Sequence, residues 1–425
     1  MSDQKQRRRV LMASLVGNSI EWFDYFLYST AAGLVFNQLF FPKSMDPLVA
    51  LMASYLTLAL TFVFRPLGGI LFAHIGDRIG RKKTLVMTLM LMGCSTVLIG
   101  LLPTYEQIGI WAPILLIILR IIQGFGIGGE WGGALLIAVE HAEGKRRAFF
   151  GSVPQMGIPI GLLLGTFSLS VMSMVTTEEQ FLSWGWRVPF ILSIVLVLLG
   201  LWLRKGIDES PIFKEAQEQG KVVRIPILET LCNYWKETLI SVGLKVVETA
   251  PFYIFGTFVV SYATLQGYSK STALNAVAIA SLVTAILIPY MGILGDRIGR
   301  KPLYIAGTIG IILFAFPYFW MIHGKSDLLL ILATIIGLGI LWTPVTAVLG
   351  TLYSEIFSTQ VRYTGATLGY QIGAAVAGGT APFIATALLG TFNSWIPIAI
   401  YLVLTSLISL LSIVSVRETK DSSLN

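Results

Sequence analysis

Long apolar runs, separated by short polar stretches, extend along almost the whole chain. The runs are continuously apolar and do not alternate every second residue, so they predict helices and not the strands of a closed barrel. Most of them reach the ~20 residues that a helix needs to cross a bilayer. Twelve such segments are predicted, near residues 10–36, 48–72, 84–103, 110–140, 148–175, 187–204, 238–265, 273–295, 302–322, 328–356, 363–390 and 396–416.

The composition of the 425-residue chain supports the same interpretation. Hydrophobic residues make up 55% of it and charged residues only 12%, whereas soluble proteins carry about 25% charged residues. The mean hydropathy is +0.76, so too little polar surface exists to cover a protein in water. A soluble enzyme, a nucleic-acid-binding module and a disordered scaffold are therefore excluded, and the fold class predicted is an all-α polytopic membrane protein.

The net charge of +7 is informative through its distribution. With the N-terminus inside, 23 of the 30 Lys and Arg residues fall on inner segments and four on outer ones. This imbalance follows the positive-inside rule and predicts that both termini are cytoplasmic in a plasma or inner membrane. The remaining three basic residues lie within predicted spans, at Arg65, Arg120 and Lys245. The basic N-terminus resembles a signal peptide, but without a small-residue cleavage site we expect a retained first span.

An internal repeat divides the chain. Residues 76–82 read Gly-Asp-Arg-Ile-Gly-Arg-Lys, and residues 295–301 repeat this string. The two copies are 219 positions apart, about half the chain, and each follows the second span of its half. Transporters are often built from such duplicated halves. We therefore predict an N-terminal six-helix bundle over 1–204, a cytoplasmic linker over 205–237 and a C-terminal six-helix bundle over 238–425.

These loops resemble the signature of the major facilitator superfamily, G-x3-D-R-x-G-R-K. The second copy fits from Gly292, and the first has Ala73 where the family usually has Gly. Residues 21–24, 64–69, 120–124, 128–133 and 209–213 further resemble the metabolite:proton symporter branch, and residues 179–187 resemble the shikimate transporter group. The resemblance implies twelve helices in two bundles, alternating access and proton-coupled uptake of a small polar metabolite. Members carry shikimate, oxoglutarate, citrate, or proline and betaine.

Ionisable residues inside predicted spans are candidates for proton coupling, because a charge within a bilayer is costly. Glu21 and Asp24 share one face of the first span. The rise of 1.5 Å per residue places Asp24 near the depth of Arg120, and Glu130 in the inner half. A carboxylate that alternates between a cation and a dry pocket changes its pKa and can carry a proton. The simpler alternative is a static ion pair between Asp24 and Arg120, and a structural role for Glu130.

A second group of residues is predicted to bind substrate. Lys245 and Glu248 share one face of the seventh span, where the lysine either anchors a substrate carboxylate or only neutralises Glu248. With Arg120 as a further cation, we expect a small anion or zwitterion with a carboxylate. Aromatic and amide side chains either add pocket contacts or pack between helices. The predicted substrate site comprises Arg120, Gln123, Trp131, Gln155, Lys245, Glu248, Tyr253, Trp342, Tyr370 and Gln371.

The repeated loops are predicted to form a cytoplasmic gate. Glycine permits the tight turn between helices, and the aspartate can accept hydrogen bonds from a helix N-terminus or an arginine of the other half. The alternative is that these residues only obey the positive-inside rule, which requires neither the acid nor the glycine. The predicted gate comprises Asp77, Arg78, Gly80, Arg81, Asp296, Arg297, Gly299 and Arg300.

No enzyme, metal or cofactor site is predicted. The pattern Gly124-x-Gly126-x-x-Gly129 follows no strand, so it lacks the context of a dinucleotide site. Two cysteines and three scattered histidines form no ligand set. We expect a monomeric proton-coupled importer with the substrate, protons and the lipid bilayer as its partners and no nucleic acid. The alternatives are an uncoupled facilitator or exchanger, or a transporter-like sensor.

Overall fold

The computed structural model describes residues 3–79, 81–128, 139, 146–205, 230, 232–357 and 362–420. Side chains are described for 15–72, 86–128, 139, 146–202, 230, 232–357 and 364–420. In this part of the chain every regular element is a helix. Most of the predicted linker, Glu130, Trp131 and Gly80 lie outside the described residues, as do the side chains of Asp77, Arg78 and Arg81.

The elements before residue 206 form the first helix group. They are α1 (Asp3–Ala31), η1 (Ala32–Phe36), α2 (Asn37–Leu39), α3 (Pro47–Ile79), α4 (Arg81–Leu101), α5 (Tyr105–Ile108), α6 (Trp111–Ile127), α8 (Arg147–Gln155), α9 (Gly157–Val175), α10 (Glu178–Gln180), η2 (Phe181–Gly185) and α11 (Arg187–Lys205). The elements labelled η are π-helical turns.

The elements after residue 229 form the second helix group. They are α14 (Trp235–Tyr253), η3 (Ile254–Phe258), α15 (Val259–Leu265), α16 (Lys270–Ile298), α17 (Arg300–His323), α18 (Asp327–Thr334), η4 (Ile335–Leu341), α19 (Thr343–Ile356), α20 (Arg362–Ala377), α21 (Thr380–Phe392) and α22 (Ile396–Val414).

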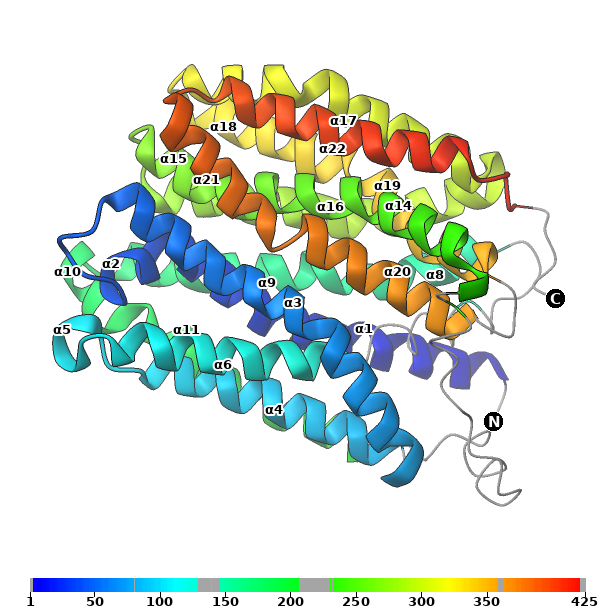
Figure 1. The fold of residues 1–425 in the computed structure, drawn as a ribbon, viewed down its shortest axis with the longest axis horizontal. Helices are drawn as coiled ribbons and strands as arrows, with labels where there is room; N and C mark the ends of the chain where they lie inside the picture. The colour runs from blue at the N-terminus through cyan, green and yellow to red at the C-terminus, as the bar shows by residue number, and fades with distance from the viewer. Residues whose placement is uncertain are drawn as a thin grey trace.

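The long helices lie roughly along one common direction, with the first group on one side of the molecule and the second on the other (Figure 1). We call the end where α1 begins and α22 ends the terminal end, and the opposite end the distal end. The loop between α16 and α17 and the start of α8 also lie at the terminal end (Figure 1).

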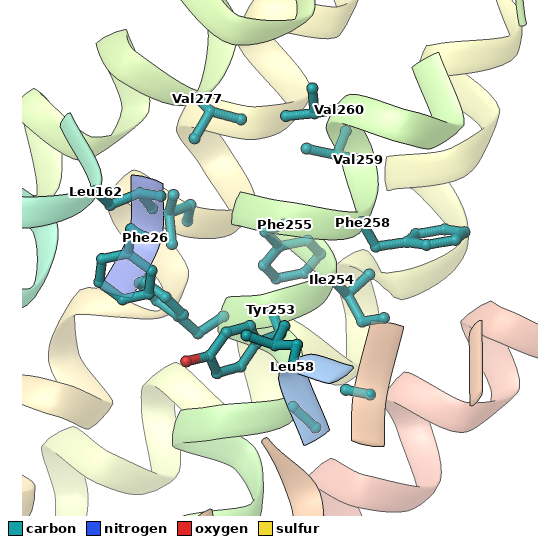
Figure 2. Close-up of a cluster of buried hydrophobic side chains, with 14 of the residues drawn as sticks. Phe26, Leu58, Leu162, Tyr253, Ile254, Phe255, Phe258, Val259, Val260 and Val277 are labelled. Carbon is teal, nitrogen blue, oxygen red and sulfur yellow. The ribbon is translucent and has the colours of Figure 1, made fainter. Parts of the chain in front are cut away.

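The two groups meet along several helices. The helices α8 and α9 pack against α16, α19 packs against α8, and α3 packs against α20 and α21. Figure 2 shows how the middle of this contact is filled: Phe26 of α1 and Leu162 of α9 gather with Tyr253 and Phe255 of the second group. Phe26, Leu162 and Phe255 are 0% exposed. Burial of such large apolar side chains helps to hold the two groups together.

The helix lengths fit a multi-pass membrane protein. Eight described helices are long and apolar enough to span a bilayer, and the bent pair Glu178–Gly185 and Arg187–Trp202 makes a ninth. Val86–Leu101 and Trp111–Ile127 are shorter apolar helices. Exposed apolar side chains such as Leu313, Trp320 and Leu411, each above 70%, give the outside of the molecule the surface that lipid requires.

Candidate functional site

A cavity lies between the two helix groups, near the middle of α1, α3, α14 and α20. In this conformation the space open to a water-sized sphere is about 20 Å³, room for about one water molecule, so a larger ligand requires the lining side chains to move apart. No lining side chain is more than 9% exposed, so bulk solvent has little access to it in this conformation. The lining residues are Trp22, Phe26, Phe62, Arg65, Ile158, Lys245, Glu248, Thr249, Phe252, Tyr253, Trp342, Tyr370 and Ala374.

An ion pair on α14 forms one wall of the cavity. Lys245 donates a hydrogen bond to Glu248, three residues further on, as their shared helix face predicts. The second oxygen of Glu248 accepts a bond from the hydroxyl of Thr346, at 3.3 Å. The Lys245 ammonium also lies 3.6 Å from the ring centroid of Tyr370, in a cation–π contact. Both charges are therefore held in place, and they neutralise one another.

Aromatic rings form most of the remaining wall. Trp22 stacks on Phe26 with ring centroids 5.1 Å apart, and Phe252 lies 4.8 Å from Trp342. The indole nitrogen of Trp342 donates to the carbonyl of Glu248 at 2.5 Å, which fixes that ring beside the ion pair. Such walls suit a small molecule with an apolar face and few polar groups.

Arg65 of α3 brings a second cation to the cavity. Its side chain is 1% exposed, and its Nε and Nη1 atoms are buried without a hydrogen-bond partner. The guanidinium lies over the rings of Phe62 and Trp22, at 5.2 and 5.5 Å from their centroids. Unmet guanidinium donors inside a protein are costly. They are therefore a place where a ligand would gain binding energy.

Arg120 occupies a different place from the one predicted. It is absent from the cavity lining, and its Nη1 atom donates to Gln123 at 2.6 Å. Its guanidinium lies 3.6 Å from the ring centroid of Tyr28 and 5.3 Å from that of Tyr25. Azimuth explains the difference, because the rise along a helix gives depth but not the direction in which a side chain points.

Asp24 is buried in the same polar network but forms no ion pair with Arg120 within 4.0 Å, although the structure describes both side chains. Its Oδ1 atom is buried without a hydrogen-bond partner. Thr96 of α4 interacts with the Asp24 carboxyl group and accepts a bond from Gln123 at 2.8 Å. The expectation of a direct Asp24–Arg120 pair is thus wrong for this conformation. Instead, Thr96 and Gln123 lie between the two residues and link them through polar contacts.

The other predicted residues are dispersed. Glu21 is partly exposed on α1, beyond the cavity lining. The amide of Gln155 donates to the carbonyl of Thr346 at 3.5 Å, and that of Gln371 donates to the carbonyl of Gly128 at 3.2 Å. Both amides cross from one helix group to the other and lie outside the cavity. Of the predicted substrate residues, Lys245, Glu248, Tyr253, Trp342 and Tyr370 line it.

At the terminal end, Asp296 joins the two helix groups. Its two carboxylate oxygens accept hydrogen bonds from the backbone N–H groups of Ala148 and Phe149, at 2.9 and 3.0 Å. These N–H groups belong to the first turn of α8, where an anion is favoured by the helix dipole. The sequence predicted such a contact, and it is found for the second copy of the repeat.

Further residues of this loop tie it to the end of the chain. Arg300 contacts Asp296 and Glu355, both at 3.3 Å. Glu418 accepts from the backbone N–H groups of Arg300 and Lys301, both at 3.0 Å. The hydroxyl of Thr419 donates to Glu355 at 2.5 Å. The residues after α22 therefore help to hold Arg300 in place beside Asp296.

Gly299 and Arg297 complete this turn. Gly299 has a φ of +108°, and a Cβ at this position would meet the carboxylate of Glu418, so glycine is required on both counts. Arg297 is exposed, and its backbone carbonyl accepts from the Lys420 ammonium at 2.6 Å. The glycine and the backbone, more than the Arg297 side chain, shape the loop.

At the distal end, hydroxyl groups join the two helix groups. Ser29 of α1 and Thr257 of η3 are 2.8 Å apart. Ser261 of α15 lies 2.6 Å from the hydroxyl of Tyr55 and donates to the carbonyl of Gly33 at 3.1 Å. Together with the Asp296 contacts, these bonds close the cavity from both ends. The lining is therefore buried in this conformation, which we call occluded, and polar contacts join the two helix groups beyond both ends of the cavity.

Comparison with known proteins adds independent information. The model of the Major Facilitator Superfamily matches residues 14–378 and 246–425. The shikimate transporter of Escherichia coli K12 is 42% identical over 97% of this chain and 95% of its own length. The inner membrane metabolite transport protein YhjE of the same strain is 40% identical over 98% and 96%. The partially occluded inward-open structure of the E. coli xylose transporter XylE is 20% identical, covers 98% of this chain and 99% of that chain, and has a TM-score of 0.76.

Proposed function

The chain belongs to the major facilitator superfamily, and we propose that it is a proton-coupled symporter that imports a small carboxylate-bearing metabolite by alternating access. The observation that carries the proposal is the occluded cavity between the two helix groups, with Arg65, Lys245 and Glu248 in an aromatic wall. Multi-pass helices and a central cavity fit a transporter. An anionic ligand would balance the surplus positive charge of these three side chains.

Alternating access would use the contacts at the two ends in turn. Loss of the Asp296 bonds to α8 would open the terminal end, and loss of the Ser261 and Thr257 bonds would open the distal end. The distribution of basic residues supports a cytoplasmic location for the terminal end. The repeat supports a rigid-body movement of residues 1–204 against 238–425 about the substrate.

Asp24 is the proposed proton carrier. It is 1% exposed, and one of its carboxylate oxygens has no hydrogen-bond partner. An ionised carboxylate without a full set of donors is costly in such a place, so protonation is favoured there. Opening to water, or a shift of Arg120 towards it, would favour release of the proton. Glu21 and Glu130 are secondary candidates for the same role.

A ring-bearing organic acid is the substrate class that fits best. A shikimate transporter shares 42% identity with the chain, and the cavity combines cations with aromatic rings. We therefore place shikimate-like acids ahead of dicarboxylates and zwitterionic osmolytes as substrates.

Reconstitution into proteoliposomes tests the coupling. An imposed pH gradient, acidic outside, is expected to drive labelled organic acid above its equilibrium concentration, and a protonophore is expected to abolish this accumulation. Counterflow with equal pH on both sides reports binding and the alternating movement without coupling. Counterflow without gradient-driven accumulation would identify an uncoupled exchanger and refute symport.

A further inference from the structure

We propose that Arg65 is the residue that binds the substrate carboxylate, and that this makes the cavity selective for a single carboxylate on an uncharged, ring-sized body. The inference rests on the proposed function in one respect, namely that the substrate enters this cavity. It goes further in assigning the anchor and in limiting the number of charges on the ligand.

The first argument is the state of the Arg65 guanidinium. It is 1% exposed, and two of its three nitrogen atoms, Nε and Nη1, have no acceptor. Its described neighbours on the cavity wall are the rings of Trp22 and Phe62 and the side chain of Tyr370, whose hydroxyl interacts with the guanidinium. Aromatic faces attract a cation but do not accept its hydrogen bonds as an oxygen does, and Nε and Nη1 stay without an acceptor. A ligand carboxylate at this point would satisfy donors that the protein leaves open.

The second argument distinguishes Arg65 from the other cation. The Lys245 ammonium already donates to Glu248 and lies against Tyr370. Glu248 is in turn held by Thr249, at 3.0 Å, and by Thr346. A substrate that used Lys245 as its anchor would have to displace Glu248 from a complete set of partners. Arg65 requires no such exchange.

The third argument concerns the number of charges. Among the described side chains that line the cavity, Arg65 and Lys245 are cationic and Glu248 is anionic, which leaves one positive charge without a counter-charge. One carboxylate neutralises it. A dicarboxylate would add a second negative charge without a partner, and a zwitterion would leave the surplus unchanged at the cost of desolvating both of its own charges.

The aromatic walls fit the remaining part of such a ligand. Trp22, Phe62 and Tyr253 all line the cavity, and Phe62 and Tyr253 meet edge to face with centroids 5.6 Å apart. Aromatic walls also bind quaternary ammonium groups. Here, however, two cations share the same space, so an uncharged ring is favoured over a cationic head group.

The inference is tested by measuring equilibrium binding to the purified full chain in lipid nanodiscs. Calorimetry measures the affinity, and no proton gradient is present. The probes are cyclohexanecarboxylate, cyclohexanecarboxamide, succinate and glycine betaine, at a pH where the acids are ionised. We expect the parent protein to prefer the carboxylate over the carboxamide by about 10- to 100-fold, the usual effect of a hydrogen bond to a charged group. Succinate and glycine betaine are expected to bind more weakly than cyclohexanecarboxylate.

Two variants locate the anchor. Arg65→Gln should lose the preference for carboxylate while it still binds the carboxamide, which also shows that the variant is folded. Arg187→Gln is the matched control: this arginine donates to the carbonyls of Gly100 and Leu102, away from the cavity, and its replacement should leave the preference intact.

Several results would overturn the inference. One is that Arg65→Gln keeps the preference for carboxylate over carboxamide, above all if Lys245→Met loses it. Another is that succinate or glycine betaine binds the parent protein more tightly than cyclohexanecarboxylate. A third is that no ring carboxylate binds. Because binding is measured without a gradient, a failure of proton coupling in proteoliposomes would leave these outcomes unaffected, so the two proposals can fail separately.

Discussion

Replacement of Asp296 by asparagine should open the terminal end of the cavity. The carboxylate accepts two hydrogen bonds from the first turn of α8, in the other helix group, and contacts Arg300. Asparagine keeps one accepting oxygen and removes the negative charge. It therefore deletes one charge-assisted bond between the groups and the favourable interaction of a charge with the α8 dipole.

The magnitude follows from these two losses. A hydrogen bond to a charged group contributes about 1.5–3 kcal/mol, and a charge at a helix N-terminus about 0.3–1 kcal/mol. Together the two losses amount to about 2–4 kcal/mol. At about 1.4 kcal/mol per factor of ten, the ratio of terminal-open to closed molecules should rise about 30- to 700-fold.

Cysteine labelling measures this shift. In a background without Cys94 and Cys232, Ala374→Cys places a thiol on the cavity wall, at a position that is 1% exposed in the occluded state. A membrane-impermeant maleimide, applied from the terminal side, should label the Asp296→Asn variant much faster than its parent.

Asp327→Asn is the matched control for this measurement. Asp327 also lies in the first turn of a helix, but it is exposed at the start of its own helix, α18. Its replacement should leave the labelling rate unchanged. A rate for Asp296→Asn within about twofold of the parent would refute the role of Asp296 as a gate, because even the smaller energy above requires a larger effect.

Three other substitutions test the remaining parts of the mechanism. Asp24→Asn should abolish gradient-driven accumulation but retain counterflow in proteoliposomes, and accumulation at the parent level would exclude Asp24 as the proton carrier. Lys245→Met should lower the free energy of unfolding by about 3–5 kcal/mol, since it leaves the Glu248 carboxylate buried and unpaired. The double variant Lys245→Met with Glu248→Gln should recover the melting temperature, and no recovery would contradict this account of the ion pair. Ser261→Ala removes two cross-group bonds at the distal end, so labelling of the cavity from the distal side should increase about tenfold, and an unchanged rate would show that these bonds do not close that end.

The fold was largely predictable because its signals are local. Continuous apolar runs determine where helices can cross a bilayer, and the two copies of the repeated loop predict a duplication from the sequence alone. The Asp296 contact with α8 was also expected, since an acid beside a tight turn can reach a neighbouring helix start. In each case the relevant physical property is carried by a few consecutive residues.

The cavity was only partly predictable because it depends on how separate helices turn toward one another. Lys245 and Glu248 share one helix, so their pairing followed from spacing alone. Arg65 and Arg120 are both charged residues in apolar helices, and depth along the helix does not show that Arg65 faces the cavity while Arg120 faces Tyr28. The signal for Arg65 was present, because an embedded cation is itself a candidate for function.

The π-helical turns had no recognisable signal in the sequence, yet η1 and η3 occur at similar positions in the first helix of each group. They also lie where the groups touch, beside Ser29 and within the segment that contains Thr257. Wide turns of this kind cluster at functional sites. Their position here follows from tertiary contacts that no short window of sequence encodes.

The wide turn η3, which directly follows α14, has a mechanical consequence. A π-helical turn contains one residue more than an α-helical turn, so its conversion to regular helix would change the register of everything beyond it by one residue. One residue of α-helix corresponds to about 100° of rotation and about 1.5 Å of translation. If η3 tightened in this way, Ser261 would swing away from Gly33 and Tyr55, while Lys245 and Glu248, before the turn, kept their places. The segment beyond η3 would thus rotate about its own axis while α14, which carries Lys245 and Glu248, stays in place.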